Sequence, residues 1–400
     1  MSATGLAPTP AARAREASRA LAALDGAARD AALAAVAAAL ERRTDEVLAA
    51  NAEDVAGAEG QTAAIVDRLR LDPGRVAGIA AAVLGIAELP DPIGAVLRDF
   101  TLENGIRIRK LRVPLGVVLV VYEARPNVTV DAAALCLKSA NACILRGSRM
   151  AANTNRVLTD IVRAGLAEAG LPADAVTAVE GGHEELAALI ADPSTADVVI
   201  PRGGEELKKL LLRESRIPVL AAAGGNCHVY VDAAADADRA VAIALNAKVQ
   251  RPGVCNAAET LLVHRDRPEL LERISAELES AGVELAQGDD AFATEFLDLK
   301  MAVGTVGSLD EAIEHINRYG TGHSEAIVTE DEAAAARFCS EVDAAAVYVN
   351  ASTRFTDGGE YGMGAEIGNS TNRLHARGPV GLEELTTTKY VVHGDGHVRA

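Results

Sequence analysis

The sequence predicts an α/β fold with two doubly wound domains, each a parallel sheet covered by helices, preceded by a helical N-terminal layer. From about residue 117 onward, short β-rich apolar runs alternate with amphipathic stretches. Continuous apolar strands between helices are typical of a parallel sheet that is buried on both faces. The chain has 400 residues, 49% of them hydrophobic, which is enough for two or three packed domains with large cores.

The helical layer is expected over residues 11–89, where alanine dominates and leucine, valine and isoleucine recur at helical spacing, as in AALAAVAAALERRTDEVLAANAEDV. An amphipathic surface for a membrane or a partner is the alternative interpretation. Acidic residues are mixed through the segment, so ordinary core packing is favoured. Pro90 and Pro92 end the layer.

A hairpin is expected next, in LRDFTLENGIRIRKLRVPLG, because a Glu-Asn-Gly turn separates two alternating arms. Arg107, Arg109 and Arg112 lie along the second arm, where alternating isoleucine and arginine give one apolar and one basic face. This basic face is a solvated surface by default; an interface for an acidic partner and an anion site are the alternatives.

Two series of predicted strands follow, with no Pro-, Ser- or Gly-rich linker between them. The first comprises residues 117–122, 142–146, 176–179, 197–200 and 218–221, and the second comprises 228–232, 260–264, 301–306, 326–330 and 345–350. Ligands of open α/β folds bind at the carboxyl ends of strands, so we expect a cleft between the two halves.

Composition excludes several classes of function. A net charge of −18 disfavours nucleic acid as a partner. The five cysteines are odd in number and form no CxxC pair, so we expect reduced thiols, no disulfide framework and no metal site. No apolar run approaches the ~20 residues that span a bilayer, and the start resembles no signal peptide, so a cytoplasmic protein without a membrane partner is expected.

One cysteine stands out as a candidate nucleophile. Cys255 lies in QRPGVCNAAETLLVH, where Pro252 and Gly253 prevent a regular helix and place the thiol on a turn. Lys248 and Arg251 are near in sequence, and basic neighbours lower a thiol pKa. The alternative is one more small buried residue.

Three long motifs together resemble the gamma-glutamyl phosphate reductase family, a branch of the aldehyde dehydrogenase superfamily. They are the Cys255 stretch, YEARPNVTVDAAALCLKSANACILRGS and NASTRFTDGGEYGMGAEIGNSTNRLHARGPVGLEELTTTKYVV. The resemblance covers nearly the whole chain. It implies an aldehyde dehydrogenase-like fold with a small β oligomerisation element, and a homo-oligomer. The implied domains are 1–225 (helical layer and NADP-binding Rossmann-like domain, interrupted by a hairpin at about 100–113), 226–380 (catalytic cysteine domain) and 381–400 (C-terminal return strand and oligomerisation segment).

The cofactor signal is indirect, because no GxGxxG follows a first strand. In DVVIPRGGEELKKLLL, Gly203 and Gly204 join a strand to a helix whose first amides would face a pyrophosphate, although a simple turn is the alternative. The resemblance implies further cofactor contacts at Arg146, Gly147, Ser148 and Glu295. An arginine fork suits a 2′-phosphate, which favours NADPH over NADH.

The resemblance also implies the chemistry: Cys255 attacks L-glutamyl 5-phosphate, phosphate leaves, and NADPH reduces the thioester to L-glutamate 5-semialdehyde, a step of proline biosynthesis. Asn127 is the implied oxyanion donor. Ala222 stands where relatives that hydrolyse the thioester carry a glutamate, so no residue activates water there. The candidates for binding the small-molecule substrate are Arg125, Asn256, Ser352, Thr353 and Arg354.

Two other functions stay open at this point. A relative that transfers the acyl group to coenzyme A would also lack the water-activating glutamate, and a catalytically idle scaffold would keep only the fold. His264, His323 and His375 are not favoured as proton donors, because nothing in the sequence gives them a partner carboxylate.

Overall fold

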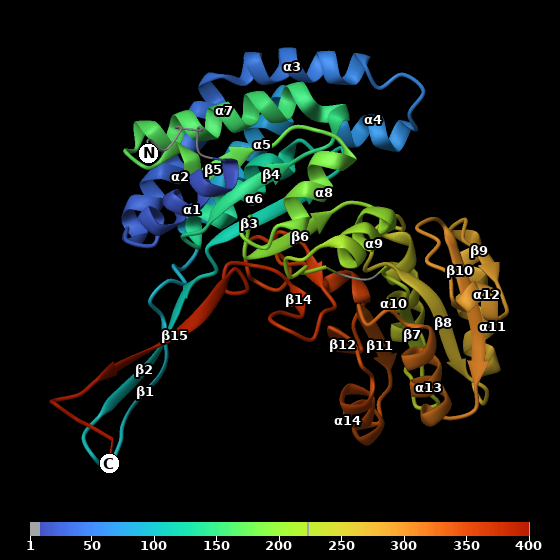
Figure 1. Ribbon diagram of the computed structural model, residues 1–400. Coiled ribbons are helices and arrows are strands. Elements are labelled where there is room, and N and C mark those ends of the chain that lie inside the picture. The colour runs from blue at the N-terminus through green and yellow to red at the C-terminus, as the bar shows by residue number, and fades with distance from the viewer. Residues whose placement is uncertain (1–8, 222–223, 400) are drawn as a thin grey trace, which may run out of the picture. The chain divides into compact units, whose positions relative to one another are not determined.

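The computed structural model describes residues 9–221 and 224–399, and the contacts within it separate two units (Figure 1). The first unit comprises the described parts of residues 1–220, 363–368 and 380–400, and the second comprises 221–362 and 369–379. Ala222, whose identity suggested that a water-activating glutamate is missing, lies outside the described residues.

The alanine-rich segment of the first unit forms helices whose starts are capped as the sequence allows. Thr9, Asp25 and Asp72 each accept a hydrogen bond from the amide three residues on, which satisfies one of the unpaired donors of a helix N-terminus. The helices are α1 (Pro10–Leu21), α2 (Gly26–Arg42), α3 (Thr44–Ala56), α4 (Ala63–Leu69) and α5 (Pro73–Glu88).

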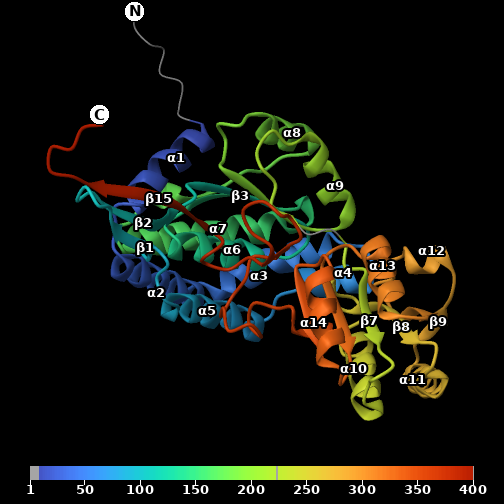
Figure 2. The same cartoon turned by 90° about the horizontal axis from the view of Figure 1, so that it is seen from below.

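The core of the first unit is a four-stranded parallel sheet in the order β5-β4-β3-β6. All six residues of its inner strand β3, VVLVVY, are buried, as expected for a strand covered on both faces. Helices α1, α6 and α7 contact the sheet, and α2 packs on α5, α6 and α7 as a further layer (Figures 1 and 2). The elements are β3 (Val117–Tyr122), α6 (Asn127–Lys138), β4 (Ala142–Arg146), α7 (Ala152–Glu168), β5 (Val176–Ala178), α8 (His183–Ala191), β6 (Val198–Arg202) and α9 (Glu205–Glu214).

The strand predicted at residues 218–221 is wrong. Only Val219 pairs with the sheet, through an isolated parallel bridge to Val199. The Pro218 carbonyl accepts the Val199 amide at 2.8 Å and the Leu220 amide donates to the Val199 carbonyl at 2.9 Å, so the pairing here is limited to a single bridge.

A separate three-stranded antiparallel sheet has the order β1-β2-β15, with β1 (Val96–Thr101), β2 (Arg107–Pro114) and β15 (Thr386–His393). It runs as a long ribbon away from the helices of its unit (Figure 1). Two arginines of β2 are engaged by acidic side chains: Arg107 donates to Asp99 at 2.6 and 2.8 Å, and Arg112 to Glu383 at 2.5 Å.

The second unit is built on a six-stranded parallel sheet in the order β12-β11-β7-β8-β10-β9. Alternate residues of β7 enter opposite cores: Val229 and Val231 pack with residues of α10 and α11, and Tyr230 packs with residues of α13 and α14. The sheet is therefore covered on both faces, and the doubly wound prediction is confirmed for this unit. The elements are β7 (Cys227–Val231), α10 (Ala237–Val249), β8 (Ala258–His264), α11 (Pro268–Ser280), β9 (Glu284–Ala286), α12 (Asp289–Phe292), β10 (Lys300–Val306), α13 (Leu309–Tyr319), β11 (Ser324–Val328), α14 (Glu332–Glu341), β12 (Ala346–Val349), β13 (Asn369–Ser370) and β14 (Gly378–Pro379).

Candidate active site

Cys255 is an exposed residue of the loop that joins α10 to β8 in the second unit. Pro252 and Gly253 form a turn just before it, as the sequence predicts. None of the five cysteines forms a disulfide, and all five lie in the described part of the chain. Cys136, Cys143 and Cys227 are buried, and Cys339 is the other exposed thiol. A reagent in solution therefore reaches Cys255 on a turn and Cys339 on the surface of α14.

A buried ion pair holds the two ends of this loop. Lys248, in the last turn of α10, donates to Glu259 on β8 at 2.7 Å, and both side chains are fully buried. The other oxygen of Glu259 accepts the amide of Leu297 at 3.2 Å. Burial raises the pKa of Glu259 to about 7, against the opposing effect of Lys248. The Lys248 ammonium group thus pairs with Glu259 and holds the two ends of the loop together.

The main chain of Cys255 is held from behind by residues 225–227. A Cβ atom on Gly225 would overlap the Cys255 carbonyl group, so only glycine fits there. Glu295 accepts the Gly225 amide at 2.6 Å, and the Cys227 thiol donates to the Cys255 carbonyl at 3.2 Å. Burial raises the pKa of Cys227, which keeps that thiol protonated as a donor.

The segment around residues 352–356 holds the other side of the loop. The Thr353 hydroxyl donates to the Asn256 carbonyl at 2.6 Å, and the Asn256 amide donates to the Thr356 carbonyl at 3.0 Å. Arg354 donates to Gln250 at 2.8 Å and also to the Asn256 side-chain oxygen. Four predicted substrate residues therefore lie together beside Cys255: Asn256, Ser352, Thr353 and Arg354.

Arg251 and Arg354 bring positive charge to this site, and Asp357 and Glu360 bring negative charge. Burial lowers the pKa of Arg354, repulsion from Arg251 adds to the effect, and Asp357, Cys255 and Glu360 oppose it. The thiol and the guanidinium are thus close enough to influence each other's charge. A cation beside a thiol favours the thiolate, which is the nucleophilic form.

In the first unit, Asn127 begins α6 and donates its side-chain amide to Asp131 at 2.9 Å. Burial raises the pKa of Asp131, which Asn127 and Arg202 partly offset. Arg125 lies half-buried in the loop before α6, and its carbonyl accepts the Val128 amide at 3.0 Å.

A cavity of about 420 Å³ opens in the first unit where β4 ends, and Gly147 and Ser148 line it with Tyr122 and Asn155. A Cβ atom on Gly147 would clash with the Asn155 amide and lie 3.1 Å from the Tyr122 ring, so glycine keeps this wall open. Of the cofactor residues predicted at this strand end, Gly147 and Ser148 therefore line a cavity.

Arg149 is a residue that sequence reasoning missed. Arg146, the predicted 2′-phosphate ligand, donates to the carbonyls of Gly181 and Gly182 at 3.4 and 3.1 Å, whereas Arg149 lines the cavity. Burial lowers the pKa of Arg146, and the neighbouring Arg149 adds to the effect. The signal was present in the tetrapeptide RGSR, which carries two arginines.

The glycine turn after β6 lies at the same edge of the sheet, because Arg202 pairs with Tyr122 and Arg146 pairs with Val121. Here the Gly204 amide donates to Glu123 at 2.8 Å. A phosphate approaching this helix start would have to displace the Glu123 carboxylate first.

Across residues 9–221 and 224–399, no group of three or more metal-ligating side chains is close enough to hold a metal ion. In the same ranges, no helix is both long enough and apolar enough to cross a membrane.

Comparison with known proteins gives consistent matches along nearly the whole chain. The aldehyde dehydrogenase family profile matches residues 8–294 and 301–391. A gamma-glutamyl phosphate reductase of Thermobifida fusca is 55% identical over 406 residues, 97% of each chain, and one of Kineococcus radiotolerans is 51% identical over 97% of this chain and 95% of its own. The crystal structure of gamma-glutamyl phosphate reductase from Thermotoga maritima superposes with a TM-score of 0.96 at 44% identity, over 98% of this chain and 99% of that one.

Proposed function

The chain belongs to the aldehyde dehydrogenase family and, within it, to the gamma-glutamyl phosphate reductases, and from that premise we propose that Cys255 is its nucleophile. The reaction is the reduction of L-glutamyl 5-phosphate to L-glutamate 5-semialdehyde and phosphate, a step of proline biosynthesis, with a nicotinamide cofactor. The fold is that of aldehyde dehydrogenases, as the sequence predicts.

The observation that carries this assignment is the exposed thiol on a loop held from three sides: by Lys248–Glu259, by Gly225 and by the 352–356 segment. A nucleophile must be accessible and fixed in place, and a scaffold protein has no need for either property.

In the proposed reaction, the Cys255 thiolate attacks the acyl carbon, the bond from carbon to the phosphate oxygen breaks, and phosphate leaves with its electron pair. The resulting thioester would be reduced by hydride from the nicotinamide cofactor, for which we propose NADPH. The hemithioacetal then collapses, releasing the aldehyde and restoring the thiolate. The Arg354 guanidinium near the thiol favours the negatively charged form of a nucleophilic sulfur.

The preference for NADPH over NADH belongs to the proposal. Arg149, Arg156 and Arg163 line the cavity of the first unit, and arginines bind phosphate groups in a bidentate way. Arg149→Gln is expected to weaken NADPH binding about tenfold, the loss expected for one charge-assisted contact, and to leave NADH binding unchanged. Equal weakening of both cofactors would argue against a 2′-phosphate at this position.

The test of the function is turnover of L-glutamate 5-semialdehyde with NADP⁺ in the reverse direction. Phosphate-dependent turnover supports the acyl-phosphate reaction, and turnover that depends on coenzyme A refutes it. Cys255→Ala is expected to lower the rate more than ~100-fold, the scale for loss of a covalent nucleophile. Cys339→Ala is the matched control, since it removes the other exposed thiol and is expected to keep the rate.

The remaining roles stay predictions. These are Asn127 as oxyanion donor, Glu295 and Gly203–Gly204 at the cofactor, Arg125 at the substrate, the domain limits, a homo-oligomer and a cytoplasmic location. For Glu295 the structure offers a defined contact, the Gly225 amide, so its replacement would act on the Cys255 loop even without touching a cofactor.

A further inference from the structure

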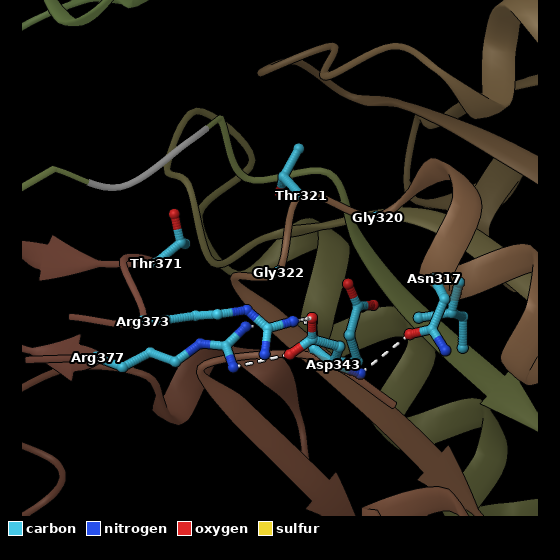
Figure 3. Close-up of a pocket in the computed structure, with 10 residues that line it drawn as sticks. Asn317, Gly320, Thr321, Gly322, Asp343, Thr371, Arg373 and Arg377 are labelled. Atoms are coloured by element: carbon cyan, nitrogen blue, oxygen red, sulfur yellow. Dashed lines mark hydrogen bonds and ion pairs between the residues drawn. The ribbon is translucent and has the colours of Figure 1, made fainter. Parts of the chain in front are cut away.

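A polar cavity of about 500 Å³ lies in the second unit, and Cys255 is not among its lining residues. Its walls come from the end of α13 and the following loop (Asn317, Gly320, Thr321), from Asp343, and from Arg373 and Arg377 (Figure 3). Figure 3 shows the two arginine side chains running side by side to Asp343. All of these residues belong to the same unit.

One wall of the cavity carries an unsatisfied carboxylate oxygen. Glu325 on β11 lines the cavity although only 1% of its surface is exposed. Its Oε2 accepts the His228 amide at 2.7 Å and lies 3.0 Å from His228 Nδ1, whereas its Oε1 has no hydrogen-bond partner among the residues that the structure describes. Burial raises the pKa of Glu325, and His228 opposes that rise. A cationic donor from a ligand at Oε1 would stabilise the charged form of this buried side chain. The C-terminal end of α13, which also lines the cavity, favours a positive charge there.

Another wall of the cavity, formed by Asp343 and the segment between β13 and β14, carries excess positive charge. Arg373 and Arg377 share the single carboxylate of Asp343, so one positive charge is left over among these three described side chains. We call Glu325 Oε1 the ammonium pole of the cavity and the Arg373–Arg377 pair its carboxylate pole. The tripeptide 320–322 lies near both: a Cβ atom on Gly320 would lie 2.7 Å from Glu325 Oε1, and one on Gly322 would lie 3.4 Å from Arg377 Nη2. The Cα atoms of alternate residues in a chain, such as Gly320 and Gly322, are at most about 7 Å apart.

We propose that this cavity binds the α-amino-acid end of a small ligand, with its ammonium at Glu325 Oε1 and its carboxylate at Arg373 and Arg377. A metal or a simple cation would meet two guanidinium groups, and a simple anion would meet Glu325 and Asp343. An α-amino acid carries both charges on one carbon and satisfies both poles. The ligand is either the amino-acid end of L-glutamyl 5-phosphate, which rests on the proposed function, or a free amino acid, which does not.

Equilibrium binding tests the site without turnover. We expect calorimetry to show binding of L-glutamate and of L-norvaline, which keeps the α-amino-acid end, and at least about tenfold weaker binding of glutarate, which lacks the ammonium. Equal affinity for glutarate, or no binding of either amino acid, would overturn the proposal.

Two variants address the two poles. Glu325→Gln and Arg373→Gln are each expected to weaken binding of L-norvaline about tenfold or more, the loss expected for one charge-assisted hydrogen bond. Arg373 is largely exposed, so its replacement decides the matter if Glu325→Gln fails to fold. Arg273→Gln is the matched control, because Arg273 is an exposed arginine paired with Asp238 in the same unit and does not line the cavity. Unchanged binding in Arg373→Gln would refute the carboxylate pole.

Steady-state kinetics distinguish the two sources of the ligand. If the substrate's own amino-acid end binds here, Arg373→Gln raises KM for L-glutamate 5-semialdehyde about tenfold, leaves the kinetics of butanal unchanged, and is partly rescued by Arg373→Lys. If a free amino acid binds, Arg373→Gln loses L-norvaline binding and keeps both KM values. Either result is separate from the proposed function, which depends on phosphate-dependent turnover through Cys255.

Discussion

Buried lysines occur in both units, but their partners differ. In the first unit, Lys138 of α6 is 2% exposed and donates to Asp30 at 2.5 Å, and the Asp30 side chain is 38% exposed. In the second unit, Lys248 and Glu259 are both 0% exposed. Water solvates one end of the first pair and neither end of the second. Removing two charges from water costs several kcal/mol per ion before their attraction is counted.

The comparison shows where the chain tolerates a fully buried ion pair. Lys138 also donates to the Ala87 carbonyl at 2.7 Å and so joins α6 to the end of α5, which is a packing role. The pair Lys248–Glu259 instead fixes the loop that carries Cys255. We infer that the costly fully buried pair is kept because it positions the nucleophile.

The largest expected effect is that of Lys248→Met. It leaves the Glu259 carboxylate buried without its cation, which typically destabilises a protein by about 3 to 5 kcal/mol. The Cys255 loop should also loosen, so kcat should fall. Urea denaturation and steady-state rates measure the two effects. A stable variant with normal kcat would break the link between the pair and the nucleophile.

The pH dependence of stability should come from the same pair. The folded-state pKa of Glu259 is about 7, above its ordinary value of 4.5, so between these pH values the folded chain binds the proton that the unfolded chain releases. The contribution of this group to stability is therefore present below pH 4.5 and is lost as pH rises to 7. Glu259→Gln should remove that slope when unfolding free energy is measured across the window, and an unchanged slope would contradict this origin.

Lys138→Met should have a smaller effect than Lys248→Met. Asp30 stays partly solvated, so the main cost is the Ala87 carbonyl without its donor, about 1 to 3 kcal/mol. We expect kcat to be unchanged, because this lysine does not contact the Cys255 loop. A loss of stability equal to that of Lys248→Met would mean that partner exposure does not distinguish the two pairs.

Lys300→Ala should have the smallest effect on stability of the substitutions considered. Lys300 donates to Glu284 at 2.6 Å on the surface of the second unit, where side-chain exposures are 36% and 70%. Exposed ion pairs contribute about 0 to 1 kcal/mol. The unfolding free energy should change within that range. A larger change would show that the exposure of an ion pair does not determine how much it contributes to stability in this protein.

The fold class was predictable from the sequence because parallel strands buried on both faces leave continuous apolar runs, such as VVLVVY at β3. Strand β9 (Glu284–Ala286) was missed, since three residues with exposed and half-buried side chains give no such run. Residues 218–221 looked apolar enough for a strand, but pairing there is limited to Val219.

The candidate site was predictable only where it is local in sequence. Cys255 on its turn and the Ser352–Arg354 motif could be found from short stretches. The partners that hold them are distant in sequence, such as Glu295 with Gly225, 70 positions apart, and Asn256 with Arg354, 98 positions apart. Arg146 alone was predicted as a 2′-phosphate ligand, and the cavity-lining position of Arg149 became visible only in the structure, where Arg146 donates to the Gly182 carbonyl.

The missing side chain at position 225 limits how this enzyme can be altered. Because any β-carbon there would occupy the space of the Cys255 carbonyl, a saturation library at this position should return glycine alone, even though the residue performs no chemistry. Attempts to broaden the range of acyl groups accepted by the chain should therefore vary the neighbours of the thiol on the 352–354 side and leave the backbone behind it as it is.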